Sequence, residues 1–312
     1  MKIVHIVAGL AENNGMANTA RQFAAEEIAR GDEAVVTNDL AAIVRGVDEV
    51  CIHGAWLPLL WKAAKRAKTA GAKLVIRPAG SYDPVRLAYH GWKKKLVAPF
   101  EHRMLLRADV LLATCEAEAE WVRAYEPRVK AIAITDLKRF FDLNHVDHVE
   151  HVDRGELHLL YLGRRHPLKG LEYLEPAVRQ IQDPTRSTCS TRLKINFCIV
   201  SDAFGDELEK VWNWCDVLVL PTLSENFGRV VAEALERGKK VITTDGAPAW
   251  GDVCECKIEN VKCKVRDGAI WQGYGGKLLY LKGYREGSRA DRVCLLKESI
   301  ASLVSCPMSS SK

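Results

Sequence analysis

The segment from Val217 to Leu235 reads VLVLPTLSENFGRVVAEAL, and it decides the fold class. The four apolar residues at its start predict a buried strand, and Pro221 begins a turn. From Phe227 onward, apolar residues recur at the spacing of a core-facing helix stripe, and Gly238 ends this helix. A strand that leads through a short turn into a helix is the repeating unit of a parallel α/β sheet.

The same unit repeats along both halves of the chain. In the first half we expect strands at 3–7, 33–37, 50–52, 73–76, 110–114 and 129–134, and helices at 18–30, 57–70, 85–107 and 116–125. In the second half we expect strands at 157–162, 194–200, 217–220 and 240–244, and helices at 170–181, 206–214, 227–237 and 290–304. This alternation implies parallel strands with right-handed crossovers. Residues 250–276 have too little periodicity for an assignment.

The length of 312 residues suits two domains of roughly 150 residues each. We expect a Rossmann-like domain at 1–140, a polar linker at 141–156, a second Rossmann-like domain at 157–290, and a C-terminal helix and tail at 291–312. His145, His148 and His151 lie in the linker at three-residue spacing. They could share a metal-binding helix face, but we favour a solvated linker. Doubly wound domains bind ligands at the carboxyl ends of their strands.

The composition narrows the class of protein. Lys and Arg number 45 and Asp and Glu number 40, so the net charge of +5 does not indicate nucleic-acid binding. No apolar run reaches the ~20 residues that span a bilayer, and the first residues resemble a strand rather than a signal peptide. We therefore expect a cytoplasmic protein, which could bind peripherally to the inner face of the membrane.

The ten cysteines of the chain indicate free thiols in a reducing compartment. Four lie in apolar segments, where cysteine serves as a small core residue: Cys51, Cys115, Cys198 and Cys215. The one cluster consists of Cys254, Cys256 and Cys263, and its spacing fits no zinc motif. We therefore expect no metal at this cluster. We also expect no cofactor elsewhere in the chain.

A basic loop follows the strand expected at 157–162. It runs from Gly163 through Arg164, Arg165, His166 and Lys169 to Gly170, just before a helix. Cations at the start of a helix suit a diphosphate group, although an exposed basic turn is the simpler alternative. The loop lacks the spacing of a P-loop.

Two acids accompany the helix expected at 227–237. Glu225 comes just before it, where it could bind a ligand or only stabilise the helix dipole. Glu233 lies off the apolar stripe, and periodicity alone places it in solvent. The backbone N–H groups of Phe227 and Gly228 are suited to an anion.

The first half offers two weaker signals. Gly15 and Met16 follow the first strand, but without the G-x-G-x-x-G spacing of a nicotinamide or flavin site. Trp92, Lys93, Lys94 and Lys95 precede further apolar residues and resemble an interfacial patch for anionic lipid. A solvated basic turn before a core helix is the alternative for that patch.

Taken together, these motifs resemble those of the retaining glycosyltransferases of family 4, which have the GT-B architecture of two Rossmann-like domains. Glu225 and Glu233 resemble the two acids of the family's E-x7-E motif, and Arg164 and Lys169 resemble its diphosphate-binding pair. The resemblance extends to about Trp250. It includes four further segments: His53-Gly54-Ala55-Trp56, Arg77-Pro78-Ala79-Gly80, the basic segment from Trp92 to Leu96, and Arg107-Ala108-Asp109.

The resemblance implies a role for each matching residue. Arg164 and Lys169 would neutralise the departing diphosphate, and Glu225 would contact the donor sugar. The donor would also be held by Asn226, Phe227 and Gly228 through backbone N–H groups, by Glu233 through the ribose hydroxyls, and by Gly15 and Met16. The family transfers a sugar from a nucleotide-diphospho-sugar to a glycan or lipid-linked acceptor, here in lipopolysaccharide or surface-polysaccharide biosynthesis.

The sequence also departs from the family pattern. The stretches 38–49 and 174–215 are short, so both domains are expected to be somewhat abbreviated. No histidine occurs at 77–80, where many relatives have one near the active site. A non-catalytic GT-B relative that binds a nucleotide or sugar as a partner subunit is therefore the alternative function. A phosphorylase or hydrolase of the same fold is a third.

Overall fold

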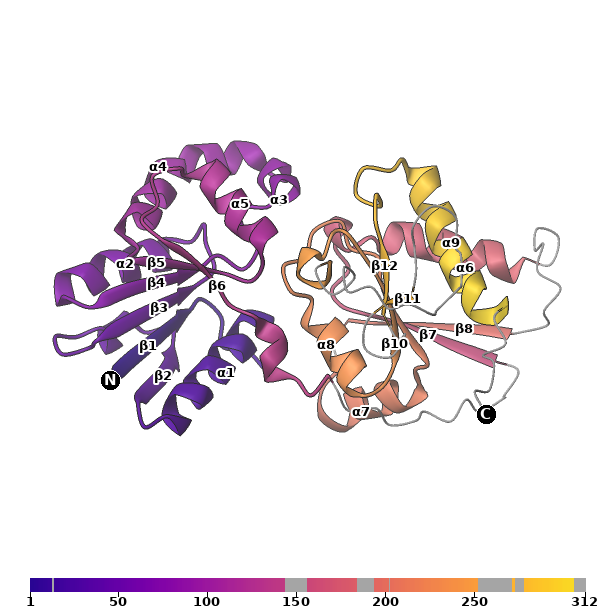
Figure 1. Ribbon diagram of the computed structural model, residues 1–312, viewed down its shortest axis with the longest axis horizontal. Coiled ribbons are helices and arrows are strands. Elements are labelled where there is room, and N and C mark those ends of the chain that lie inside the picture. Colours follow the sequence, from indigo (N-terminus) through magenta and orange to yellow (C-terminus); the bar gives the residue numbers. More distant parts are fainter. Residues whose placement is uncertain are drawn as a thin grey trace. The chain divides into compact units, whose positions relative to one another are not determined.

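The computed structural model describes residues 1–12, 14–143, 156–183, 194–201, 203–251, 271–272 and 278–305. The chain divides into two compact units, Met1–Phe140 and Phe141–Lys312, and each contains one sheet of six strands (Figure 1). This confirms the expected α/β class with two Rossmann-like domains. The histidines of the expected linker at 145–151 and the cysteines at 254–263 lie outside the described residues.

The sheet of the first unit is parallel throughout, in the order β2-β1-β3-β4-β5-β6. Its strands are β1 Lys2–Val7, β2 Glu33–Thr37, β3 Glu49–His53, β4 Lys73–Arg77, β5 Val110–Ala113 and β6 Ile132–Ile134. Its helices are α1 Gly15–Ala29, α2 Pro58–Ala70, α3 Pro84–Ala88, α4 Gly91–Arg107 and α5 Glu116–Tyr125, with 3-10 turns at Leu40–Ala42 and Leu137–Phe140.

Strand alternation sends the side chains of this sheet to two different layers. Val4, Ile52 and Ile76 pack in the main core with residues of α2, α4 and α5. Val7 packs on the other face, against Ala17 and Ala20 of α1. Figure 1 shows α1 on one side of the sheet and α2, α4 and α5 on the other.

The second unit has a mixed sheet in the order β11-β12-β10-β9-β7-β8. Its strands are β7 Glu156–Leu162, β8 Lys194–Val200, β9 Val217–Leu220, β10 Lys240–Thr244, β11 Trp271–Gln272 and β12 Leu278–Leu281, of which β11 alone is antiparallel to its neighbour. Its helices are α6 Leu171–Gln182, α7 Gly205–Trp214, α8 Arg229–Glu236 and α9 Arg289–Ser305, with 3-10 turns at Pro167–Lys169 and Pro248–Trp250.

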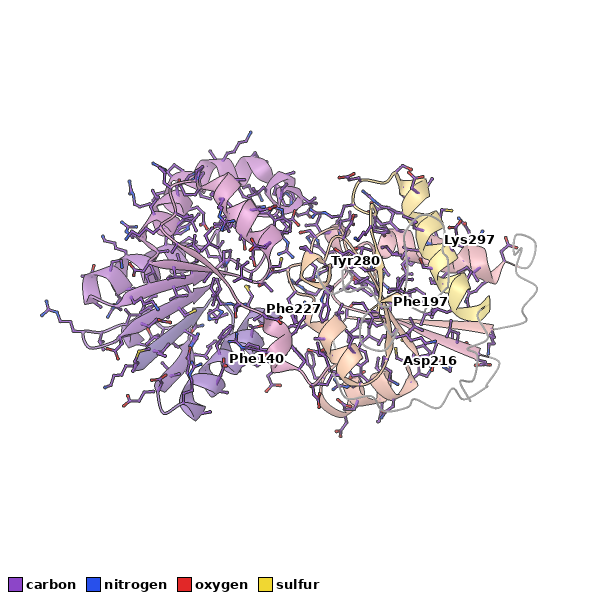
Figure 2. All side chains as sticks on the ribbon, viewed as in Figure 1. Phe140, Phe197, Asp216, Phe227, Tyr280 and Lys297 are labelled. Carbon is purple, nitrogen blue, oxygen red and sulfur yellow. The ribbon has the colours of Figure 1, made fainter. Side chains whose placement is uncertain are left out.

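One core cluster joins the sheet of the second unit to two of its helices. Val219 and Ile242 pack there with Leu174 of α6 and with Leu296 and Ile300 of α9. In each unit, side chains fill the space between the sheet and its helices (Figure 2). None of the helices within the described ranges has both the length and the hydropathy that a bilayer span requires.

Two expectations about elements were wrong, and one strand was not predicted. The helix expected at 85–107 is two helices, because His90 adopts a left-handed conformation (φ 54°) between α3 and α4. The helix expected at 227–237 begins only at Arg229, because Gly228 is also left-handed (φ 65°). Residues 278–281, outside every strand predicted above, form the fully buried strand β12.

The cysteine predictions can be checked at four positions. Cys51, Cys115 and Cys215 are buried and Cys198 is half-buried, all as free thiols. Burial raises the pKa of Cys215 to about 12, so this thiol is unreactive near neutral pH.

Candidate functional site

Two loops of the second unit meet where β7 and β9 end. The carbonyl of Leu168 accepts hydrogen bonds from Leu223 N at 2.8 Å and from the Thr222 hydroxyl at 3.0 Å. Gly170 is left-handed (φ 70°), and a Cβ there would lie 1.8 Å from the carbonyl oxygen of Pro221. Only glycine allows the two loops to come this close.

A third loop, after β10, joins the same cluster. Glu225 N donates to the carbonyl of Gly246 at 2.7 Å. A Cβ on Gly246 would lie 2.1 Å from the carbonyl oxygen of Thr222, which also accepts a hydrogen bond from the Thr244 hydroxyl. Because β10, β9 and β7 are neighbours in the sheet, their carboxyl ends form one continuous edge. Parallel sheets bind ligands at this edge.

These loops bring two predicted site residues together. The ammonium group of Lys169 forms an ion pair with Glu225 Oε2, and both side chains are 18% exposed. The other carboxylate oxygen of Glu225 accepts a hydrogen bond from Asn226 N at 3.1 Å. These two charges are more than fifty residues apart in the sequence, and the hydrogen bonds between the loops bring them together. One cation and one anion are therefore fixed at the carboxyl edge of the sheet, still within reach of solvent.

Close packing around a glycine also holds the turn before α8 in place. A Cβ on Gly228 would lie 3.2 Å from Cγ of Glu225 and 3.3 Å from Cδ2 of Leu220. The ring of Phe227, labelled in Figure 2, is buried and stacks on Trp250 with centroids 5.2 Å apart. The Trp250 indole N–H donates to the carbonyl of Phe227. The side chain of Phe227 is therefore part of the core, and its backbone is held in place beside Glu225.

Glu233 is half-buried rather than fully solvated, in contrast to the prediction from periodicity. Its carboxylate lies 3.6 Å from Nε of Arg229, one helical turn earlier in α8. Burial raises the pKa of Glu233, while Arg229 and Arg237 oppose the shift. Burial also lowers the pKa of Arg229, whose guanidinium lies 5.1 Å from the ring of Phe141. Arg229 was not among the predicted site residues, although the four-residue spacing between Arg229 and Glu233 is typical of a helical ion pair.

The remaining donor-side prediction, Arg164, lies on the loop after β7 and is exposed. Its carbonyl accepts a hydrogen bond from the Tyr161 hydroxyl at 3.0 Å, which anchors the backbone of the loop. In the described part of the chain, its guanidinium contacts neither Glu225 nor another acid, whereas the neighbouring Arg165 lies 3.5 Å from Glu175. Arg164 is thus close in sequence to Lys169 but outside the Lys169–Glu225 pair.

Gly15 and Met16 belong to the first unit and form the start of α1 at the carboxyl end of β1. Asn14 caps this helix, because its side-chain oxygen accepts hydrogen bonds from Met16 N at 3.0 Å and Ala17 N at 3.4 Å. A Cβ on Gly54 would lie 3.3 Å from the sulfur of Met16. Met16 therefore packs against the end of β3.

A buried chain of polar side chains crosses the first unit, and the residues alone did not predict it. His5 Nε2 lies 2.7 Å from Glu27 Oε2, and His5 Nδ1 lies 2.9 Å from His53 Nε2. His53 Nδ1 lies 3.0 Å from Nη1 of Arg77. We refer to Glu27, His5, His53 and Arg77 as the relay. Its residues come from α1, β1, β3 and β4.

The direction of each hydrogen bond in the relay follows from its two ends. Arg77 can only donate, so His53 accepts at Nδ1 and donates from Nε2. His5 then accepts at Nδ1 and donates from Nε2 to the Glu27 carboxylate. This order requires two neutral rings. For His53 it agrees with the lowered pKa that burial, Arg77 and His5 produce.

His5 is subject to opposing influences. Burial disfavours the charged form of His5, whereas its hydrogen bonds with Cys51 and Glu27 favour that form. A charged His5 would donate from both nitrogens, and His53 would then have to direct an N–H at the Arg77 guanidinium. Two donors cannot share a hydrogen bond, so the 3.0 Å contact between His53 and Arg77 favours neutral His5.

The ligand atoms of His5, Cys51 and His53 lie within 4.8 Å of one another, a set that could bind zinc. Both nitrogens of His53 already make hydrogen bonds, however, and one partner is the cation of Arg77. A metal at this position would face that positive charge in a dry core. The residues therefore fit the relay better than a metal site.

The basic segment of the first unit lies in and around α4. Trp92, Lys93 and Lys95 are exposed, as an interfacial patch requires. Lys94 is half-buried instead, and donates hydrogen bonds to the carbonyls of Tyr89 (3.1 Å) and Arg86. Burial and the nearby Arg86 lower the pKa of Lys94. One of the three predicted surface lysines therefore holds the turn between α3 and α4.

Comparisons with known proteins agree with this architecture. Residues 34–135 match the model of the glycosyl transferase 4-like domain, and residues 156–267 match that of the glycosyl transferases group 1. No curated protein matches the sequence.

Several solved structures are similar over nearly the whole chain. Sucrose-phosphate synthase from Thermosynechococcus elongatus aligns with a TM-score of 0.60 and 14% identity, over 97% of this chain and 94% of its own. HepE from Anabaena, in complex with UDP and glucose, aligns with a TM-score of 0.57 and 14% identity, over 97% and 95%. A trehalose-6-phosphate synthase, studied for glycosyl transfer with retention, aligns with a TM-score of 0.54 and 9% identity, over 97% and 95%.

The two family matches together cover more than two thirds of the 312 residues, one in each unit. The solved structures share the two-domain GT-B fold. The first unit therefore contains a glycosyl transferase 4-like domain, the second contains a domain of the glycosyl transferases group 1, and the chain has the GT-B fold.

Proposed function

We propose that the protein is a retaining glycosyltransferase that moves a sugar from a nucleotide-diphospho-sugar to a glycan or lipid-linked acceptor. One observation carries the proposal. The Lys169–Glu225 ion pair lies where hydrogen bonds join three loops, at the carboxyl edge of the sheet of the second unit, and this is the edge at which parallel sheets generally bind ligands. Transfer needs a cation for the departing diphosphate and an acid beside the sugar hydroxyls, and both residue types are present there.

The electrostatic requirement explains why a lysine is needed. When the glycosidic bond to the donor breaks, negative charge grows on the diphosphate and positive charge on the sugar ring. A fixed cation aimed at the growing charge stabilises the transition state by about 3 kcal/mol, judged from the loss of a single such donor in other enzymes. Lys169 is positioned by the Leu168 hydrogen bonds, and Arg164 supplies a second cation from the same loop. We propose that these two replace a divalent metal.

The other residues would bind the rest of the donor. Glu225 would accept hydrogen bonds from the sugar hydroxyls, and the backbone N–H groups of Asn226, Phe227 and Gly228 would contact the sugar or a phosphate. Glu233 would accept hydrogen bonds from the ribose hydroxyls. This role suits a half-buried carboxylate that has only a 3.6 Å contact with Arg229. Gly15 and Met16 would contribute from the first unit.

Retention and biological setting are further parts of the proposal. The similarity to a trehalose-6-phosphate synthase studied for transfer with retention supports a front-face reaction. In it, a donor phosphate oxygen helps to deprotonate the acceptor. We propose lipopolysaccharide or surface-polysaccharide biosynthesis at the cytoplasmic face of the membrane.

The first test is thermal unfolding with UDP, GDP, ADP, CDP or TDP in the absence of metal. A ligand that binds only the folded state raises the midpoint by mass action. We expect one nucleotide to stabilise the wild type and Lys210→Ala, an exposed lysine of α7, but not Lys169→Ala. If no nucleotide shifts the midpoint of well-folded protein, the donor site is wrong. Binding without turnover of any nucleotide-sugar would favour a non-catalytic partner subunit.

A further inference from the structure

The outer surface of α4 is apolar, where a helix of a globular domain is usually polar. Trp92, Leu96 and Phe100 are 64%, 70% and 53% exposed. They follow one another at four-residue spacing, so they form one stripe along the helix. Phe100 also stacks on Trp61 of α2, with ring centroids 5.3 Å apart. Three large exposed apolar side chains in one stripe indicate a surface that is covered in use.

Basic residues dominate the charges of α2 and α4, although Lys68 of α2 pairs with Asp109. Helix α2 carries four Lys and Arg residues and α4 carries five, whereas Glu101 is the one acid in either helix. Glu101 is fully buried, where it accepts hydrogen bonds from Trp61 Nε1 (2.6 Å) and Trp56 N (3.0 Å). Lys93 and Lys95 flank the stripe, and no acid of the described residues forms an ion pair with either. The surface is therefore apolar with an uncompensated positive charge.

A cavity of about 720 Å³ opens beside the stripe. Aromatic rings form much of its lining, from Trp56, Trp92, His102 and Tyr125, and Lys95 lies at its edge. Tyr125 stacks on His102, with centroids 4.6 Å apart and planes 2° from parallel. The volume is in the range of small-molecule sites.

Tyr125 lines this cavity, and its hydroxyl becomes available to a ligand when the side chains around the oxygen shift. Its oxygen is buried and has no hydrogen-bond partner among the described residues. A buried hydroxyl without a partner loses free energy relative to one that is bonded. Burial, Glu101 and Glu126 raise the pKa of Tyr125 to about 12, so the group keeps its proton and can donate it in a hydrogen bond.

We propose that this face of the first unit binds an anionic phospholipid bilayer. Trp92, Leu96 and Phe100 enter the interfacial region, Lys93 and Lys95 contact lipid phosphates, and the cavity takes one headgroup, to which Tyr125 donates a hydrogen bond. An apolar stripe between lysines matches an interface that is apolar below and anionic above. A nucleic acid would use the lysines but leave the apolar stripe uncovered.

The inference depends only on the first unit and is independent of the donor site. Co-sedimentation with two kinds of vesicle separates apolar insertion from electrostatic attraction. One kind is neutral phosphatidylcholine, and the other contains one quarter phosphatidylglycerol. We expect binding to the anionic vesicles alone, weakened by salt because exposed charges are screened. Equal binding to both vesicle types, or no binding by folded protein, would overturn the proposal.

Variants assign the binding to this face. Lys93→Gln with Lys95→Gln should weaken binding by roughly 10- to 30-fold, since each basic residue near the surface contributes about one factor of five. The matched control removes two other exposed lysines, Lys2→Gln with Lys210→Gln, and should bind like the wild type. Equal losses in both pairs would show a general charge effect and contradict a specific face.

The apolar stripe is tested separately. Trp92→Ser with Leu96→Ser should abolish sedimentation at physiological salt. Its control, Ile28→Ser with Val44→Ser, removes other exposed apolar side chains (55% and 52% exposed) and should leave binding unchanged. If the Trp92→Ser, Leu96→Ser variant binds vesicles as well as the wild type, the stripe does not insert into the bilayer.

Tyr125→Phe removes only the unpartnered hydroxyl. We expect it to weaken binding to the anionic vesicles several-fold while the midpoint of thermal unfolding stays the same or rises. Unchanged vesicle affinity would overturn the headgroup assignment. Nucleotide-induced stabilisation should be normal in all of these variants. If nucleotides do not stabilise the wild type either, the proposed donor site is wrong. The vesicle experiments then still decide the lipid proposal.

Discussion

Two charged clusters, one in each unit, differ in what water can reach. In the relay of the first unit, His5, His53, Arg77 and Glu27 are all less than one tenth exposed. In the second unit, Lys169 and Glu225 are each 18% exposed at the end of the sheet. Each side chain of the relay is hydrogen-bonded to another buried side chain of the relay. Lys169 and Glu225 instead form a partly exposed pair that a ligand can reach. The first cluster therefore serves the fold, and the second can exchange partners.

The largest effect on stability is expected from breaking the relay. Glu27→Gln removes its one anion, the carboxylate that accepts the His5 hydrogen bond, while Glu118 still acts on Arg77. Loss of a buried hydrogen bond to a charged group costs about 1.5–3 kcal/mol of stability. Urea unfolding measures this loss, and Glu33→Gln, an exposed acid at the start of β2, is the control. Stability within about 1 kcal/mol of the wild type would contradict the relay's structural role.

Lys169→Ala should greatly reduce activity and leave stability almost unchanged, the reverse of what we expect for Glu27→Gln. We expect transfer to fall by about 10²- to 10³-fold, because a cation aimed at the departing diphosphate is lost. Stability should change by about 1 kcal/mol or less, since the Lys169–Glu225 pair is partly exposed. Release of nucleoside diphosphate from the donor gives the rate, with Lys210→Ala as control. A folded variant that keeps most of its activity would remove Lys169 from the mechanism.

Gly170→Ala tests whether the loops themselves are required. The new Cβ would lie 1.8 Å from the carbonyl oxygen of Pro221, in a left-handed conformation. We expect a loss of about 1–3 kcal/mol in stability and weaker nucleotide binding, because the loops must separate. Gly71→Ala at the end of α2 is the control: it has a similar φ of 82° but open space around the Cβ. Equal effects of the two variants would point to backbone strain alone.

A spectroscopic test sharpens the description of the relay. Nitrogen-15 NMR at pH 7 should show His5 and His53 as neutral rings, each protonated at Nε2. Neutrality follows from the Arg77 donor at one end and the Glu27 acceptor at the other. A charged His5 would show that its pair with Glu27 outweighs the contact between His53 and Arg77.

Much of the donor region was predictable from sequence because its signals are local. The stretch around Glu225 combines strand, turn and helix within twenty residues, and the basic loop with Lys169 follows another strand. What the sequence could not indicate is the contact between them, which depends on strands β7 and β9 being neighbours. The close approach at Gly170 and Gly246 likewise depends on tertiary structure.

The relay was not predictable from the residues alone. His5 and His53 each lie in an apolar strand, where a lone histidine carries no particular signal, and Glu27 occupies a helix position that packs against the sheet. Only the strand order β1-β3-β4 brings the four groups together. The break at His90 was missed because an α-helical pattern continues across it. Strand β12 was missed because it follows the unassigned stretch 250–276, with no neighbouring element to indicate a strand.

The central claim is that the Lys169 charge is shared between Glu225 and the nucleotide diphosphate. The most direct measurement is calorimetric titration of Glu225→Gln with UDP, or with the nucleotide that stabilises the wild type most. Loss of the competing carboxylate should tighten binding by about 2- to 5-fold, the free energy of a partly exposed ion pair. The tightening should vanish in the double variant with Lys169→Ala, and Glu207→Gln should bind like the wild type. Weaker binding by Glu225→Gln, or tightening that persists without Lys169, would contradict the account.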